Sequence, residues 1–319
     1  MKKTTQIETN PFPHSDTNRR FYTFDYFLRQ KFGGKVAKIP LDGGFTCPNL
    51  DGTRGVGGCI YCSSRGSGDF APEARLTVTE QFQQGVASLS DKWKPVGFIP
   101  YFQAHTNTYG PVDRLRALFE EALAQPGVVG LSIATRADCI SPAIADLLRE
   151  IAGKTFLTVE LGLQTAHDRT AERINRCHTF AEFLRGYELL RGVDVCIHLI
   201  EGLPGEDHGD MMETARRVAE LRPFAVKLHL LHVLKETALA DLWEKGEYTP
   251  MELADYVRAV CDTLEVLPPD TVIERVTGDG PPDILLSPLW SRKKFVVMNE
   301  IDKELVCRDS WQGKKFTAE

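Results

Sequence analysis

Residues 36–62 read VAKIPLDGGFTCPNLDGTRGVGGCIYC, a short apolar run followed directly by a glycine-rich segment with three cysteines. Cys47, Cys59 and Cys62 supply three thiolates. A closed zinc site and an ordinary electron-transfer cluster each need four ligands. Three cysteines in one loop therefore indicate a cubane iron-sulfur cluster that keeps one iron free for a small molecule. The glycines suit a backbone that must fold closely around such a cluster.

Apolar runs bounded by turn residues recur along the chain, and they alternate with segments whose apolar residues are spaced three to four apart. The expected strands are Val36–Leu41, Val96–Phe102, Val128–Ala134, Phe156–Leu163, Val193–Ile200 and Ala225–Leu231. The expected helices are Leu76–Ser88, Val112–Ala124, Pro142–Ile151, Asp168–Ile174 with Ala181–Leu190, Met211–Leu221 and Met251–Leu264. This alternation predicts an α/β fold with buried parallel strands. Polar motifs follow the strands, so functional residues are expected at the carboxyl edge of the sheet.

The composition is that of a globular protein. With 319 residues and 42% apolar content, the chain can bury a large core. No run of about 18 uncharged apolar residues is present and the first residues are polar, so we expect a cytoplasmic protein with no membrane partner. In a reducing compartment, clustered cysteines favour a metal or catalytic site over disulfides. The five scattered cysteines are expected to be buried free thiols.

Basic residues concentrate near both ends of a chain whose formal net charge is −6. Residues 1–40 hold eight Lys and Arg against three Asp and Glu, and residues 288–319 hold seven against five. Basic ends are typical of RNA contact, and the alternative is ordinary solvated surface charge. The candidate RNA-contacting residues are Arg19, Arg20, Lys31, Lys35, Arg292, Lys293 and Lys294, with Tyr22 and Trp290 as stacking surfaces.

Seven motifs together resemble the YhcC/YtqA family of radical S-adenosylmethionine (SAM) proteins, over about residues 20–305. The motifs are GGFTCPN (43–49), QAHTNTY (103–109), TRADC (135–139), VELGLQT (159–165), INR (174–176), HLIEGLPGE (198–206) and SPLWS (287–291). The cysteines are separated by eleven residues and then two, which departs from the common spacing of three and then two. This spacing is closer to the long-spaced branch that includes the elongator-type tRNA-modifying enzymes.

The resemblance implies a partial (βα)6 barrel of TIM type with a short C-terminal β-containing extension. It implies that Cys47, Cys59 and Cys62 hold a 4Fe-4S cluster whose open iron binds SAM. One electron then cleaves SAM to methionine and a 5′-deoxyadenosyl radical, which abstracts hydrogen from a substrate. The expected division is a flexible polar leader at 1–18, a core at 19–267 with the cluster loop at 43–62, and the extension at 268–319. Strands are expected in this extension at Val272–Val276 and Phe295–Met298, and a connection before it at Lys235–Thr249.

The resemblance also assigns candidate roles to residues on the expected rim. Tyr61 would pack near the adenine of SAM. The methionine part and the ribose would be bound by Gln103, Thr106, Asn107, Gln164 and Arg176, with His198, Glu201 and Gly202 near the ribose and adenine. Glu160 and Gln164 are expected to take part in catalysis. An unpaired carboxylate inside an apolar strand is costly, so Glu160 should line the cavity or pair with a cation, for which Arg136 is the candidate.

The implied substrate is a modified wobble uridine of tRNA, whose carboxymethylaminomethyl-type side chain the radical would remodel. The expected partners are tRNA and a reducing electron donor such as flavodoxin or ferredoxin. A second hypothesis keeps the radical chemistry but gives it a small metabolite or a tetrapyrrole as substrate. A third, from another class, is a non-catalytic RNA-binding module with zinc held by the three cysteines and His105. The sequence leaves open whether Cys177 takes part in the chemistry.

Overall fold

Seven parallel strands form the central sheet and lie side by side in the order in which they occur along the chain. The structure is a computed structural model that describes residues 10–66, 68–89 and 94–317. The strands are β1 (Val36–Leu41), β2 (Gly97–Phe102), β3 (Gly130–Thr135), β4 (Phe156–Gln164), β5 (Asp194–Glu201), β6 (Ala225–Leu230) and β8 (Val272–Arg275). Because every neighbouring pair is parallel, the carboxyl ends of all seven strands lie at one edge.

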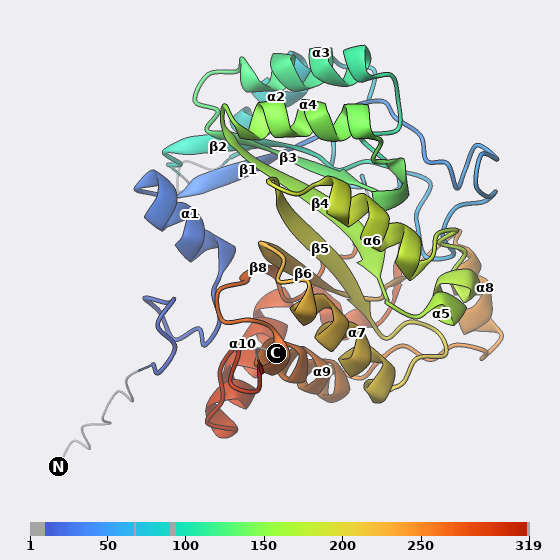
Figure 1. Ribbon diagram of the computed structural model, residues 1–319. Coiled ribbons are helices and arrows are strands. Elements are labelled where there is room, and N and C mark those ends of the chain that lie inside the picture. Colours follow the sequence, from blue (N-terminus) through green and yellow to red (C-terminus); the bar gives the residue numbers. More distant parts are fainter. Residues whose placement is uncertain (1–9, 67, 90–93, 318–319) are drawn as a thin grey trace.

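Helices cover the outer face of this sheet (Figure 1). The covering helices are α2 (Val78–Ala87), α3 (Val112–Leu123), α4 (Pro142–Ala152), α6 (Phe180–Leu189), α7 (His208–Glu220) and α9 (Leu253–Val266). In α4 the buried side chains recur at three-to-four spacing and face the strands. The side chain of Ser141 caps this helix by accepting a hydrogen bond from the backbone N–H of Ile144.

The sheet curls until its two edge strands approach each other. Lys38 on β1 forms an ion pair with Glu274 on β8, with 2.7 Å between the Lys Nζ and a Glu oxygen. The segment before α1 (Phe24–Phe32) covers β8, since the Ile273 N–H donates to the Tyr22 carbonyl at 2.7 Å. The architecture is therefore a curled half-barrel. This confirms the predicted parallel barrel class, with seven strands where six were expected.

The helices and strands predicted for the core are confirmed, with bounds that differ by a few residues. In the C-terminal part the prediction is only half right. The expected strand at 272–276 exists as β8, but it completes the main sheet and is not part of a separate extension. The expected strand at 295–298 is wrong, because these residues lie in α10 (Lys294–Cys307). Val297, Ile301 and Leu305 are spaced four apart and buried in the core, which favours the helix.

Short elements fill the connections. They are η1 (Ala137–Cys139), α5 (Asp168–Arg173), β7 (Val233–Leu234), α8 (Ala238–Glu244), β9 (Leu285–Ser287) and η2 (Leu289–Arg292). The connection expected at 235–249 thus contains the helix α8. In the expected leader, residues 1–9 lie outside the described residues. Phe12 is buried and Asp16 pairs with Arg29, so the described part of the leader makes fixed contacts with the core.

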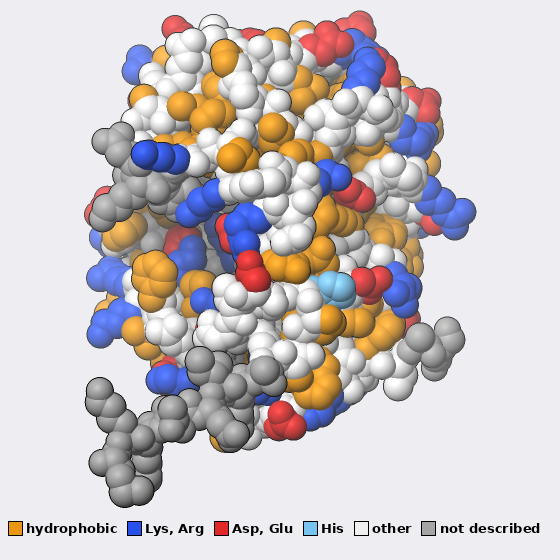
Figure 2. Space-filling model, turned by 90° about the vertical axis from the view of Figure 1, so that its left-hand side faces the viewer, with side chains coloured by type: hydrophobic (Ala, Val, Ile, Leu, Met, Phe, Trp, Pro, Cys, Tyr) orange, Lys and Arg blue, Asp and Glu red, His pale blue; other side chains and the backbone are white. Residues whose placement is uncertain are grey.

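Figure 2 views the molecule from the side on which α1 lies in Figure 1. Lys and Arg side chains lie among hydrophobic ones on this face. At the amino ends of β5, β6 and β8 the structure has a groove of about 1370 Å³, whose lining includes Asp194, Arg222 and Asp270. Among the described residues, no helix has the length and apolar character needed to span a bilayer.

Candidate active site

The three cysteines lie in the long loop between β1 and α2, at the carboxyl edge of the sheet. Two asparagines hold this loop in place. Asn175 donates from Nδ2 to the carbonyls of Val56 and Gly58, at 3.0 and 2.7 Å. Asn49 donates to the Asn175 carbonyl, and its Nδ2 lies 3.6 Å from the Sγ of Cys59. The loop is thus fastened to the segment that follows α5.

The donor set of the loop fits an iron-sulfur cluster. Thiolates are the ligands that such clusters prefer, and the loop offers three of them. A hydrogen bond with Cys62 lowers the pKa of the Cys59 thiol to about 7, and the charge of Arg136 also favours the thiolate against the effect of burial. Within the described ranges, no three His, Cys, Asp or Glu side chains converge closely enough to hold a single metal ion.

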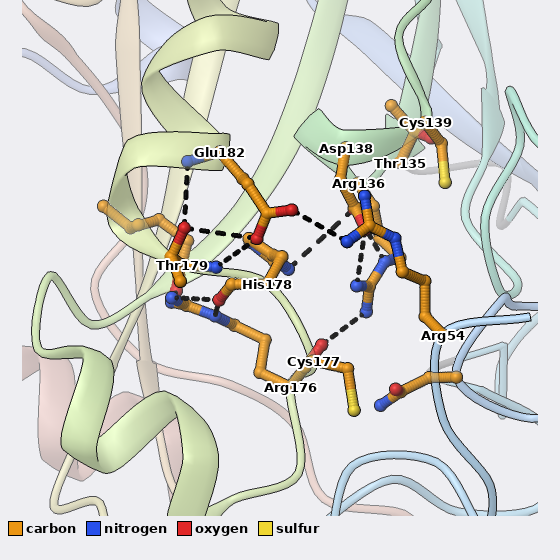
Figure 3. Close-up of polar contacts among 12 residues, drawn as sticks. Arg54, Thr135, Arg136, Asp138, Cys139, Arg176, Cys177, His178, Thr179 and Glu182 are labelled. Carbon is orange, nitrogen blue, oxygen red and sulfur yellow. Dashed lines mark hydrogen bonds and ion pairs between the residues drawn. The ribbon is translucent and has the colours of Figure 1, made fainter.

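Arg136 follows β3 and lies beside the cysteine loop (Figure 3). Its guanidinium donates two hydrogen bonds to the Asp138 carboxylate, both at 2.9 Å, and one to the carbonyl of Arg176, also at 2.9 Å. Arg54 from the cysteine loop also approaches Asp138, at 3.7 Å, and pairs with Glu182 at 2.7 Å. These contacts bring a cation next to the thiolates and fix its orientation.

The prediction that Arg136 is the partner of Glu160 is wrong, because Arg136 pairs with Asp138. Glu160 lies instead at the centre of a charged cluster inside the barrel, to which each of the seven strands contributes one side chain. The cluster, here called the interior network, consists of Lys38, Tyr101, Ser132, Glu160, His198, Lys227 and Glu274. It lies on the inner face of the half-barrel, below the rim that the carboxyl ends of the strands form.

Glu160 is fully buried and is surrounded by donors. Its oxygens bond to Lys38 (2.7 Å), Tyr101 (2.8 Å), Ser132 (2.7 Å), His198 (2.7 Å) and Lys227. Burial alone would raise the pKa of this carboxyl group, but the charges of Lys227 and Lys38 outweigh burial and hold the pKa well below its usual value. Glu160 is therefore ionised at neutral pH, and with Glu274 it balances the two lysines.

Sequence reasoning missed most of the interior network. A signal for it was present, because Lys38 and Lys227 each interrupt an otherwise apolar strand, as Glu160 does. Charged residues of opposite sign inside buried strands are expected to meet in the interior of a barrel. What the sequence does not reveal is the register that places these side chains at the same level.

Arg176 does not present its guanidinium to an open site. The side chain is buried, and it donates to the backbone carbonyls of Leu163, Thr165 (2.7 Å) and His178 (3.1 and 2.9 Å). Burial lowers its pKa to about 10. These bonds hold the turn after β4, where Gln164 has a left-handed backbone with φ of 63°. The structure therefore gives Arg176 a positioning role, and its expected contact with a carboxylate stays a prediction.

The residues expected after β2 lie together near the cysteine loop. Thr106 and Asn107 are buried, and Gln103 is half-buried. Asn107 donates from Nδ2 to the carbonyls of Ala104 (3.0 Å) and Ala134 (2.9 Å), while its Oδ1 is buried with no hydrogen-bond partner in the described part of the chain. A buried acceptor that lacks a donor suits a ligand that brings one, such as an ammonium group.

The remaining expected residues lie on the same edge. Tyr61 packs against the apolar cluster that includes Ile174 and Leu231, its hydroxyl lies close enough to bond Cys59, and burial raises its pKa. Glu201, at the end of β5, is buried, and burial with the nearby Glu206 raises its pKa to about 7. Gly202 has φ of 84° and lines a pocket of about 390 Å³ between the β5–α7 loop and the start of α9.

Cys177 lies beside the cysteine loop (Figure 3). Its sulfur donates to the side-chain oxygen of Asn175 at 3.2 Å. A Cβ atom at Gly55 would lie 2.6 Å from this sulfur, so the loop can pass so closely only because residue 55 is glycine. The structure thus places Cys177 in packing contact with the loop.

Comparison with known proteins identifies the family. Residues 52–218 match the radical SAM superfamily, and residues 223–306 match the radical SAM C-terminal domain. The chain is 49% identical to the uncharacterized protein YtqA of Bacillus subtilis, over 97% of each chain. It is 40% identical to protein YhcC of Escherichia coli, over 87% of this chain and 90% of that one.

Two more distant similarities are weaker in sequence. It is 28% identical to the tRNA uridine(34) acetyltransferase of Methanocaldococcus jannaschii, over 51% of this chain and 30% of that one. Its fold matches the archaeal Methanocaldococcus infernus Elp3 with a TM-score of 0.62 at 19% identity, covering 84% of this chain and 63% of that one. Radical SAM enzymes use a 4Fe-4S cluster and SAM. The three cysteines of the loop are suitable ligands for such a cluster. The chain therefore belongs to the radical SAM enzymes, in the family of YtqA and YhcC.

Proposed function

We propose that this radical SAM enzyme remodels the side chain of the wobble uridine of tRNA. The observation that carries the proposal is the similarity, over about half of the chain, to an enzyme whose name gives uridine 34 of tRNA as its target. The fold, which matches that of an Elp3 protein, agrees with it. We further propose that the protein works in the cytoplasm with a reduced electron donor such as flavodoxin or ferredoxin, because this chemistry needs an external electron.

In this proposal the cysteine loop holds the 4Fe-4S cluster through Cys47, Cys59 and Cys62. Such a cluster would supply the electron needed for reductive cleavage of SAM, the radical chemistry of this family. Most of the proposed SAM-binding residues lie at or after the carboxyl ends of the strands, and two belong to the interior network below this edge. The first group is Tyr61, Gln103, Thr106, Asn107, Arg136, Gln164, Arg176, Glu201 and Gly202, and the second is Glu160 and His198. Asn107 offers its unpaired Oδ1 to the ammonium group of SAM, and Arg136 balances the charge of the thiolates.

Two of the residues expected to contact RNA make bonds within the protein. Arg20 is buried and bonds to Asp309 and to backbone carbonyls, and Trp290 donates its indole N–H to the Met251 carbonyl. These two residues therefore do not form an open RNA-binding rim. An aromatic side chain nearby is open to solvent, since Phe295 is 79% exposed and lies two residues after Lys293. An exposed aromatic ring next to cations is suited to stacking on an unpaired base.

We expect Lys293→Gln and Phe295→Ala each to weaken tRNA binding. Loss of one phosphate contact should reduce the slope of log K against log salt by about 0.9, and loss of one stacked base should weaken binding about tenfold. Filter binding at several salt concentrations measures both quantities. Lys303→Gln, also on α10 but paired with Glu300, is the matched control and should change neither. If all three variants bound tRNA with the affinity of the wild type, this surface would not be part of the tRNA-binding site.

Mass spectrometry of tRNA nucleosides tests the function itself. Deletion of the gene should cause a carboxymethylaminomethyl-type wobble nucleoside to accumulate. The purified and reconstituted enzyme, given SAM, a reductant and this tRNA, should convert that nucleoside. An unchanged nucleoside profile in the deletion strain, together with SAM cleavage that does not respond to tRNA, would contradict the proposal. Those results would favour a small metabolite or a tetrapyrrole as the substrate.

A further inference from the structure

Two histidines at the carboxyl end of β6 have a ring nitrogen without a partner. The Nε2 atoms of His229 and His232 are buried, and neither has a hydrogen-bond partner among the described residues. A buried polar atom that lacks a partner destabilises the folded protein, because it loses its bonds to water without gaining others. Two such atoms at the edge where parallel sheets bind their ligands indicate groups that a ligand satisfies.

The two histidines lie at the mouth of the barrel, above the interior network. His229 is two residues after Lys227 on the same strand, so both side chains point to the inner face. Its ring centroid lies 5.2 Å from that of His198, whose Nε2 contacts Glu160. His232 lies in the connection between β6 and β7.

The segment after β8 closes this wall of the mouth. A Cβ atom at Gly278 would lie 3.5 Å from the His232 ring and 3.6 Å from the His229 ring, so both rings face this glycine across a gap about the size of a methyl group. The ion pair between Lys38 and Glu274 brings the β1 edge of the sheet close to the β8 edge. Ile60 and Tyr61 of the cysteine loop pack against the apolar cluster that includes Leu231 and Val233, so this loop and the two histidines lie close together at the carboxyl edge of the sheet.

Both imidazoles are neutral at physiological pH. Burial lowers the pKa of His232 to about 4, and Arg275 adds to this effect while Asp279 opposes it. Burial also lowers the pKa of His229 well below its usual value, with further contributions from His198, Arg275 and Lys227. A neutral imidazole offers one donor and one acceptor. The two imidazoles are therefore better suited to a neutral ligand that carries a hydrogen-bond donor and an acceptor next to each other than to an anion.

We propose that His229 and His232 hold the pyrimidine ring of the target nucleotide, with their Nε2 atoms hydrogen-bonded to its imide edge. The inference rests on the proposed function and names the part of the site that recognises the base. An enzyme that acts on a base must take it out of the stack and receive it in a pocket. Proteins bind such bases by stacking on aromatic rings, histidine included, and by bonds to the Watson–Crick edge.

Paired substitutions at each histidine test the proposal. His229→Leu and His232→Leu remove the nitrogen atoms at similar volume, whereas His229→Gln and His232→Gln place an amide near the position of Nε2. We expect each leucine variant to lower kcat/KM for conversion of the wobble nucleoside by about 10- to 100-fold, and each glutamine variant to restore most of it. The control is His208→Leu, since His208 is exposed and pairs with Asp262. Iron content and tRNA affinity, measured on every variant, show whether the fold is intact.

A cross-linking experiment locates the base directly. An anticodon stem-loop with 4-thiouridine at the wobble position is irradiated on the reconstituted protein, and the attached peptide is identified by mass spectrometry. We expect attachment within residues 225–235. Attachment to another segment, or leucine variants that keep kcat/KM within about twofold, would overturn this inference while the proposed function stood. A wild-type enzyme that converts no wobble nucleoside would remove the proposed function and this inference together.

Discussion

Replacing Cys59 with alanine is expected to abolish the formation of 5′-deoxyadenosine. The variant keeps only two thiolates in the loop, Cys47 and Cys62, and a cluster of this type needs three to stay bound. Cys59 also lies 3.6 Å from the Nδ2 of Asn49, so its removal takes away one contact of that amide inside the loop, while the bonds between the loop and Asn175 remain. The measurement is anaerobic reconstitution with iron and sulfide, reduction, addition of SAM, and chromatographic quantification of 5′-deoxyadenosine.

The matched control is Cys307→Ala, because Cys307 is an exposed free thiol at the end of α10. This variant should take up iron and cleave SAM as the wild type does. If the Cys59→Ala protein kept a full cluster and still cleaved SAM, other residues would have to hold the iron. A wild-type protein that takes up zinc and forms no cluster after reconstitution would contradict the assignment of the whole loop.

The sequence predicted the core of the fold well, because buried parallel strands and amphipathic helices leave distinct patterns. It failed at residues 295–298, where Phe-Val-Val-Met has the composition of a strand. The structure forms a helix there because Val297, Ile301 and Leu305 together bury one face in the core. A window of four residues cannot show that periodicity, which appears only over the fourteen residues of α10.

The active site was predictable where its residues are close in sequence. The cysteine spacing located the loop, and the cost of burying a carboxylate predicted that Glu160 either lines the cavity or pairs with a cation, of which the structure shows the second. The cation itself was not predictable, because Lys38 and Lys227 are 122 and 67 residues away and meet Glu160 only through strand register. The same limit applies to His229 and His232, whose missing partners are visible only in three dimensions.

Replacing Glu160 with glutamine is expected to destabilise the protein by about 3–5 kcal/mol, since breaking a buried ion pair leaves its partners uncompensated. Lys38 and Lys227 would then share the single carboxylate of Glu274. The size of the side chain is unchanged, so the effect reports charge and not packing. Anaerobic urea unfolding of the reconstituted wild-type and variant proteins measures the difference in the free energy of unfolding.

The matched control for this change is Glu182→Gln. Glu182 pairs with Arg54 near the surface and caps α6, so its loss should cost about 1 kcal/mol. The double variant Glu160→Gln with Lys227→Met should be more stable than the sum of the two single changes predicts, because it removes both members of one pair. Additive effects would mean that Glu160 and Lys227 do not stabilise the barrel as a pair.

The pH dependence of the Glu160→Gln effect separates charge from hydrogen bonding. The folded pKa of Glu160 lies well below its usual value of 4.5, so the carboxylate contributes its full stabilisation above that value and loses it as the pH falls toward the folded pKa. The difference in the free energy of unfolding between the wild type and the variant should therefore be constant near neutral pH and become smaller in acid. A difference that stays the same in acid would show that Glu160 acts through neutral hydrogen bonds to Ser132 and Tyr101, and the interior network would then be a packing feature without a role for its charge.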